Sequence, residues 1–112
     1  MPTTPQAVFH YEVQKSVDET TGPITTIFCR GRLVSETSGQ IKEVVKPLIP
    51  QGGRIVLDLT DVSYLDSSGL GTLVGLKVSV LREGYCILEL VNLSPRVKEL
   101  LRLSNLTNLF ST

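Results

Sequence analysis

The sequence has few metal-binding residues and no excess of charge of either sign. It contains 2 cysteines and 1 histidine, too few for a structural zinc site. Its 11 basic residues balance 11 acidic residues, so it lacks the positive field that nucleic acid or an anionic membrane requires. We therefore expect no metal, no cofactor and no nucleic acid partner.

Long apolar runs and a secretory signal are missing as well. The apolar runs are too short to span a bilayer, and residues 1–6 contain neither a basic nor an apolar signal region. The sequence thus predicts a cytoplasmic protein without direct membrane insertion. Cys29 and Cys86 each lie in an apolar run. We expect two buried free thiols, with a disulfide between them as the alternative.

The length and composition fit one domain. The chain has 112 residues, 41% apolar and 20% charged, which is typical of a soluble globular protein with one modest core. Residues 1–7 carry two prolines among polar neighbours and predict a flexible N-terminal tail. Residues 8–112 predict a single domain.

The first part of that domain predicts a β-hairpin. Phe9, Tyr11 and Val13 alternate with polar residues, which is the period of a half-buried strand over residues 8–17. Residues 18–23 have turn chemistry. The β-branched and aromatic residues of 24–30 predict the second strand.

A helix is expected next. The apolar residues at helical spacing are Ile41, Val44, Val45 and Leu48. Ser35 and Thr37 are candidate N-caps, and residues 37–40 match a capping box. Pro47 should kink or end this helix.

The second half predicts alternating strands and helices. The nearly continuous apolar run at 54–59 predicts a central strand buried on both faces. A helix should follow and end at Gly84. Its predicted apolar stripe consists of Leu70, Leu73, Val74, Val78 and Leu81. Residues 86–91 predict another strand, and residues 107–110 predict a short edge strand.

A third helix is expected between those two strands. Ser94 and Pro95 are a typical N-cap and first helical residue, and Asn105 can end the helix. Its predicted buried face consists of Val97, Leu100 and Leu101. With right-handed crossovers, the expected fold is α/β, a mixed sheet of four or five strands with three or four helices packed on it.

The most informative segment, residues 66–71 (DSSGLG), links the central strand to the second helix. A helix N-terminus offers unpaired N–H groups and partial positive charge, which can receive an anion. Gly69 and Gly71 allow close approach of another backbone. A purely structural alternative is that Asp66 or Ser67 only caps the helix.

Several landmarks together resemble STAS domains of the anti-sigma-factor antagonist family. The landmarks are residues 31–33 (GRL), 55–59 (IVLDL), 62–71 (VSYLDSSGLG), 93–97 (LSPRV) and 103–106 (LSNL). The resemblance extends over residues 8–110. It implies a STAS-type fold and a bacterial protein that acts by binding a protein partner and not as an enzyme.

The resemblance also implies a switch that regulates transcription. In the family, a kinase-type anti-sigma factor phosphorylates the serine that corresponds to Ser67, and a phosphatase restores it. We expect the N–H groups near Gly69 and Leu70 to receive a phosphate on Ser67. The unphosphorylated form binds the anti-sigma factor and so releases the sigma factor. The implied partner-binding residues are Leu33, Val34, Ser35, Asp66, Ser67, Ser68, Gly69, Leu70 and Gly71.

The sequence departs from the family at Val34, where phosphorylated members usually carry an aspartate that helps phosphorylation. This departure favours a weakly phosphorylated or permanently binding version. STAS-like domains also serve lipid or anion transporters, so an accessory or regulatory transporter subunit that binds without phosphorylation is the alternative function.

Enzymatic alternatives have weaker support. Residues 69–71 give half of a dinucleotide fingerprint, without the third glycine. A serine hydrolase elbow would need glycine in place of Leu65, and His10 is the only histidine. A metal pocket at Asp58, Asp61 and Asp66 would also need a lysine on a later strand, and residues 86–91 contain none. We therefore expect Asp58 to make a structural hydrogen bond or to lie at the edge of the strand.

Overall fold

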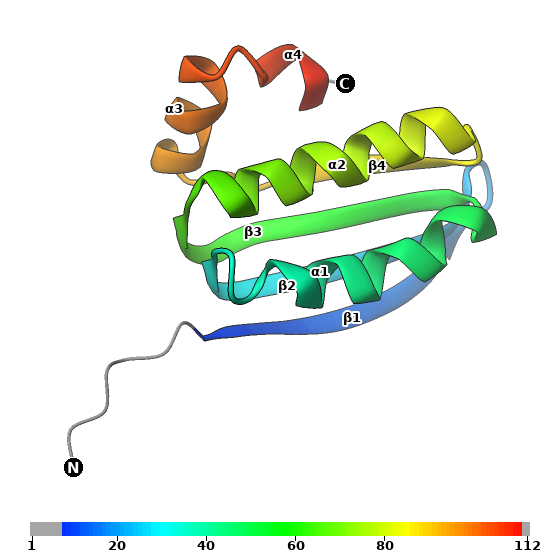
Figure 1. Cartoon of the computed structure of the whole chain (residues 1–112). Helices are drawn as coiled ribbons and strands as arrows, with labels where there is room; N and C mark the ends of the chain where they lie inside the picture. The colour runs from blue at the N-terminus through cyan, green and yellow to red at the C-terminus, as the bar shows by residue number, and fades with distance from the viewer. Residues whose placement is uncertain (1–7, 111–112) are drawn as a thin grey trace.

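The computed structural model describes residues 8–110 as a sheet with helices packed on it (Figure 1). The elements are β1 (Phe9–Asp18), β2 (Gly22–Leu33), α1 (Ser38–Val45), the 3-10 helix η1 (Lys46–Gln51), β3 (Gly53–Leu65), α2 (Ser67–Glu83), β4 (Cys86–Val91), α3 (Pro95–Leu103) and α4 (Thr107–Phe110). The predicted α/β class with a mixed sheet is confirmed. The tail predicted at residues 1–7 lies outside the described residues and stays a prediction.

The strands lie in the order β1-β2-β3-β4. β1 and β2 form the predicted antiparallel hairpin, while β2, β3 and β4 run parallel. The hairpin turn is closed by Asp18, whose Oδ1 accepts hydrogen bonds from the N–H groups of Thr20 (2.7 Å) and Thr21 (3.0 Å). Because β2, β3 and β4 are parallel, their carboxyl ends meet at one edge of the sheet, where β3 turns into α2.

Helices α1 and α2 lie side by side over the same face of the sheet (Figure 1). On that face Ile55, Leu57 and Leu59 of β3 are buried, whereas the intervening Val56 and Asp58 are only half-buried. The prediction of a strand buried on both faces was therefore wrong. A continuous apolar run does not show whether helices cover one face or two.

Helix α1 begins after Thr37, as predicted, but the predicted capping box is wrong. The Thr37 side chain makes no capping bond to the helix. Its Oγ1 accepts from the Val34 N–H (3.0 Å) and donates to the Arg32 carbonyl (2.6 Å), so it closes the loop after β2. The helix ends at Val45 and continues as η1, in agreement with the break expected at Pro47.

Helix α2 has the predicted start and its predicted end at Gly84, which takes the left-handed conformation (φ 74°). Its predicted apolar stripe is only partly correct, because Val78 and Leu81 are 43% and 61% exposed. The long buried side chains of α2 are Leu73, Leu76, Lys77 and Val80. The buried face thus includes a lysine, which a search for apolar periodicity misses.

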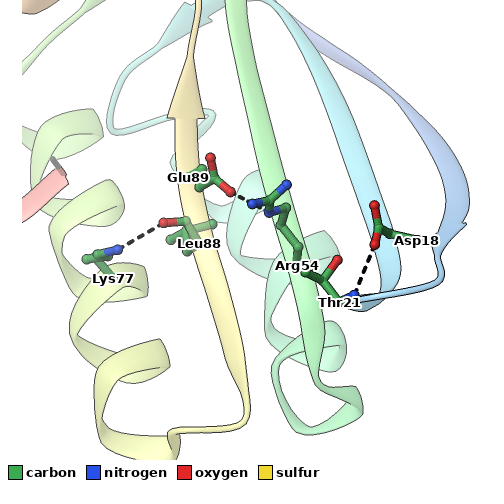
Figure 2. A network of polar contacts seen from close by, with 6 residues as sticks. All are labelled: Asp18, Thr21, Arg54, Lys77, Leu88 and Glu89. Carbon is green, nitrogen blue, oxygen red and sulfur yellow. Dashed lines mark hydrogen bonds and ion pairs between the residues drawn. The ribbon is translucent and has the colours of Figure 1, made fainter. Parts of the chain in front are cut away.

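Lys77 lies against β4. Its stem is buried and its Nζ donates to the Leu88 carbonyl at 2.9 Å (Figure 2). An amphipathic lysine can pack its methylene groups in a core when its ammonium finds an acceptor. On β3 and β4, Arg54 Nε and Glu89 Oε1 form an ion pair at 2.5 Å (Figure 2).

The last part of the chain departs from prediction in one element. Ser94 caps α3 by accepting from the Val97 N–H (3.2 Å), and Asn105 ends it with φ 57°, both as expected. Residues 107–110 form helix α4 and not an edge strand. The sheet in residues 8–110 therefore has four strands.

Both cysteines are buried free thiols, as expected. Burial raises the pKa of Cys29 to about 12, and the nearby Asp58 carboxylate acts in the same direction. Burial also raises the pKa of the Cys86 thiol. Burial therefore disfavours the reactive thiolate form of both cysteines.

Candidate functional site

The candidate site is the corner at which β3 turns into α2. Asp66 is extended and caps the helix, because its Oδ1 accepts from the Gly69 N–H at 2.9 Å. Ser67 follows as the first helical residue and is exposed. The N–H groups of Gly69 and Leu70 were expected to receive a phosphate, but this was wrong, because they already donate to Oδ1 (2.9 Å) and to the carbonyl oxygen (2.9 Å) of Asp66. Within residues 8–110 we find no acceptor for the N–H groups of Ser67 or Ser68. These N–H groups and the Ser67 hydroxyl are thus available to a partner or a phosphate.

The loop after β2 packs directly on this corner. The Asp66 N–H donates to the Leu33 carbonyl at 3.3 Å. A β-carbon on Gly69 would lie 2.1 Å from the same Leu33 oxygen, so no other residue fits at that position. The structure therefore brings residues 33–35 and 66–71 together, as expected from the sequence.

The predicted partner-binding residues differ in their access to solvent. Ser35, Ser67, Ser68 and Gly71 are exposed, Asp66 and Leu70 are half-buried, and Leu33, Val34 and Gly69 are buried. The buried residues position the backbone of the corner. The surface that a partner can reach consists mainly of serine hydroxyls and bare backbone.

Val34 is held in place by the loop it belongs to. Its side chain is 7% exposed. Its carbonyl accepts from the N–H groups of Thr37 (3.0 Å) and Ser38 (2.8 Å). Position 34 therefore contributes no carboxylate beside Ser67, and Asp66, next to Ser67 in the chain, uses Oδ1 to cap the helix.

Two arginines near this corner were missed by the sequence reasoning. The guanidinium carbons of Arg32 and Arg96 lie 5.0 Å and 5.6 Å from the centre of the Tyr64 ring. These residues come from β2, α3 and β3, so three elements meet here. Such cation–π contacts stabilise the arrangement, and both arginine residues are exposed. The pairing of Arg32 with Tyr64 depends on strand register, which leaves no signal in the sequence.

Asp58, one of the acidic residues considered for a metal site, makes structural hydrogen bonds. Asp58 accepts hydrogen bonds from the Thr60 N–H (2.9 Å), the Thr60 hydroxyl (2.5 Å) and the Asn92 side chain (2.9 Å). Burial alone would raise the pKa of Asp58, but these hydrogen bonds outweigh it and lower the pKa. The predicted structural hydrogen bond of Asp58 is confirmed. Among residues 8–110, no three potential metal-binding side chains come together.

Two further features of the described residues are the position of His10 and the character of the helices. His10 is exposed on β1 and pairs across the hairpin with Arg30, far along the chain from Ser67. Within residues 8–110, none of the helices combines the length and the apolar character needed to cross a bilayer.

Comparison with known proteins identifies the family. The family model of the STAS domain matches residues 15–112. The anti-sigma-B factor antagonist of Listeria monocytogenes is 36% identical over 84 residues, which are 74% of this chain and 73% of that protein.

Two solved structures share the fold. The anti-sigma factor antagonist SpoIIAA, in its unphosphorylated form, superposes with a TM-score of 0.69 and 25% identity over 88% of this chain and 84% of that chain. The murine anion transporter Slc26a9 superposes with a TM-score of 0.63 and 16% identity over 86% of this chain but only 18% of that chain, which shows a shared fold alone. Since the family model and the Listeria relative each cover most of its length, this chain belongs to the STAS-domain family.

Proposed function

We propose that this protein is an anti-sigma factor antagonist, which binds an anti-sigma factor of the serine-kinase type and is switched off by phosphorylation of Ser67. The name of the Listeria relative supports the role, and SpoIIAA has been solved in both unphosphorylated and phosphorylated forms. The observation that carries the proposal is the exposed Ser67 hydroxyl at the first residue of α2. The protein would act in the cytoplasm and regulate transcription.

The switch needs no change of fold. A phosphate on Ser67 adds a charge of about −1.5 to −2 near neutral pH. The available N–H groups of Ser67 and Ser68 can receive it in place. The charge then lies within the surface that meets the partner, where desolvation and repulsion favour dissociation. A phosphatase that removes the phosphate restores binding.

In this reaction the chain supplies the acceptor hydroxyl of Ser67, and the kinase supplies the bound ATP. The Ser67 oxygen attacks the γ-phosphorus of ATP, the bond to the ADP oxygen breaks, and the hydroxyl proton passes to a base. Val34 cannot accept that proton and Asp66 serves as the helix cap. We therefore expect the kinase to supply the base, and phosphorylation to be slower than in family members that carry an aspartate at the position of Val34.

The test uses the purified chain, ATP and each kinase-type anti-sigma factor encoded in the same genome. We expect one phosphoryl group on Ser67, located by peptide mass spectrometry, and at least about tenfold weaker binding of the phosphorylated form. Ser67→Ala should not be phosphorylated. Ser68→Ala, which removes the neighbouring exposed hydroxyl, is the matched control and should be phosphorylated normally.

Two results would contradict the proposal. One is phosphorylation of Ser67→Ala at the wild-type rate, and the other is the lack of binding to every such anti-sigma factor. In the second case, co-purification with a transporter ATPase or an anion transporter would favour the alternative function.

A further inference from the structure

A groove runs between α1 and α2 and begins beside the candidate site. Its volume is about 490 Å³, within the range of binding sites in proteins. Ser68, Gly71, Gly75 and Ser79 of α2 form one wall, and Lys42 and Lys46 lie on the other. A smaller hollow of about 240 Å³ shares Lys46 and Ser79 with it and extends towards Glu83. The groove thus follows most of α2, starting one residue after Ser67.

Two glycines in this groove have no role inside the domain. Glycine is disfavoured in a helix interior relative to alanine, and α2 contains Gly69, Gly71 and Gly75. Gly69 is required by the Leu33 carbonyl. At Gly71 and Gly75, however, an added β-carbon would meet no atom within 4 Å. Both residues are exposed, so they give the groove a bare backbone wall that another backbone can approach.

The opposite wall carries positive charge. Lys42 and Lys46 are four residues apart, so their side chains lie about one turn apart on the same side. The ion pairs found in residues 8–110, Arg54–Glu89 and Glu99–Arg102, involve neither lysine. None of the residues that line the larger groove is acidic. The groove therefore favours an occupant with carboxylates.

We propose that this groove binds an acidic helix of the anti-sigma factor. Two carboxylates one helical turn apart would face Lys42 and Lys46, and the helix backbone would lie against Gly71 and Gly75. This inference rests on the proposed function and names the surface and the partner chemistry involved. Phosphorylation of Ser67 puts negative charge at the end of the groove, where it repels an acidic helix.

The first test separates stability from binding. We expect Gly71→Ala and Gly75→Ala each to raise Tm by about 4 °C or more and, because a methyl group intrudes into the interface, to weaken binding to the anti-sigma factor about tenfold. Gly39→Ala in α1 is the matched control. Its β-carbon also meets no atom within 4 Å and it does not line the groove, so affinity should be unchanged.

The second test concerns charge. We expect Lys42→Glu and Lys46→Glu each to weaken binding at least about tenfold and to reduce its salt dependence. Lys15→Glu on β1, the same charge change away from the groove, should leave affinity unchanged. Wild-type affinity in all the groove variants would contradict binding of the anti-sigma factor in this groove but would leave the proposed function intact. Failure of the wild-type chain to bind any kinase-type anti-sigma factor would overturn both.

Discussion

A β-carbon at position 69 would lie only 2.1 Å from the carbonyl oxygen of Leu33, so only glycine allows this close packing. This contact fixes the loop after β2 against the N-terminus of α2. It also fixes the backbone that carries Asp66 and Ser67. The lack of a side chain at Gly69 therefore helps to set the geometry of the corner that carries Ser67, the residue that we propose to be phosphorylated.

Gly69→Ala should destabilise the protein. The methyl group would collide with backbone, which moves less easily than a side chain, so we expect a loss of about 1–3 kcal/mol in the free energy of unfolding. Urea denaturation followed by circular dichroism measures it. Gly75→Ala in the same helix, with open space around its β-carbon, is the control and should change stability in the opposite direction. An unchanged midpoint for Gly69→Ala would contradict the role given to this contact.

Among the elements, helix α2 was predicted correctly at its two ends but only in part along its buried face. Its ends follow from local chemistry, namely the Asp66 cap and the left-handed Gly84. Its buried face does not, because Lys77 occupies a core position and bonds to β4. Periodicity that counts only apolar residues places Val78 and Leu81 in the core, although both are exposed.

Variants of Lys77 should separate its packing from its hydrogen bond. Lys77→Ala removes the buried stem and leaves the Leu88 carbonyl without this donor, so we expect a loss of about 2–4 kcal/mol. Lys77→Met keeps most of the stem and should lose only about 1 kcal/mol. Urea unfolding of both variants measures the difference. Equal losses for the two variants would show that packing of the stem contributes little.

The contrast between local signals and tertiary packing explains how much of the fold and of the site could be predicted from the sequence. The hairpin turn, the break at Pro47 and the cap at Ser94 are local signals, and the structure contains them all. Residues 107–110 were wrongly expected to be a strand, because four residues carry too little periodicity. At the site, the exposure of Ser67 follows from its place after a helix cap. The burial of Val34 depends on tertiary packing and could not be predicted.

For the molecule as a whole, Asp58 links the central strand to the segment after β4. Its carboxylate accepts from Thr60 and from Asn92, which is 34 residues away in the chain. Burial would raise the pKa of Asp58, but the hydrogen bonds lower it below the ordinary value of 3.8. The ionised form is therefore favoured more in the folded state than in the unfolded state.

This difference predicts a loss of stability in acid. The contribution of Asp58 is fully present above its unfolded-state pKa, near 3.8, and disappears as the pH falls through the lower pKa of the folded state. The free energy of unfolding, measured by urea denaturation between pH 7 and pH 2, should thus decrease less for Asp58→Asn than for the wild type. A stability difference between the two proteins that stays constant over this range would contradict the assignment.

The glycines at 71 and 75 have a consequence for engineering. A directed-evolution campaign that rewards heat resistance alone would accumulate alanine at both positions, because nothing inside the domain opposes it. The selected proteins would be more stable and would keep their fold, yet on our proposal they would capture the anti-sigma factor far more weakly. Screens for robust versions of this domain should therefore score partner capture in every round.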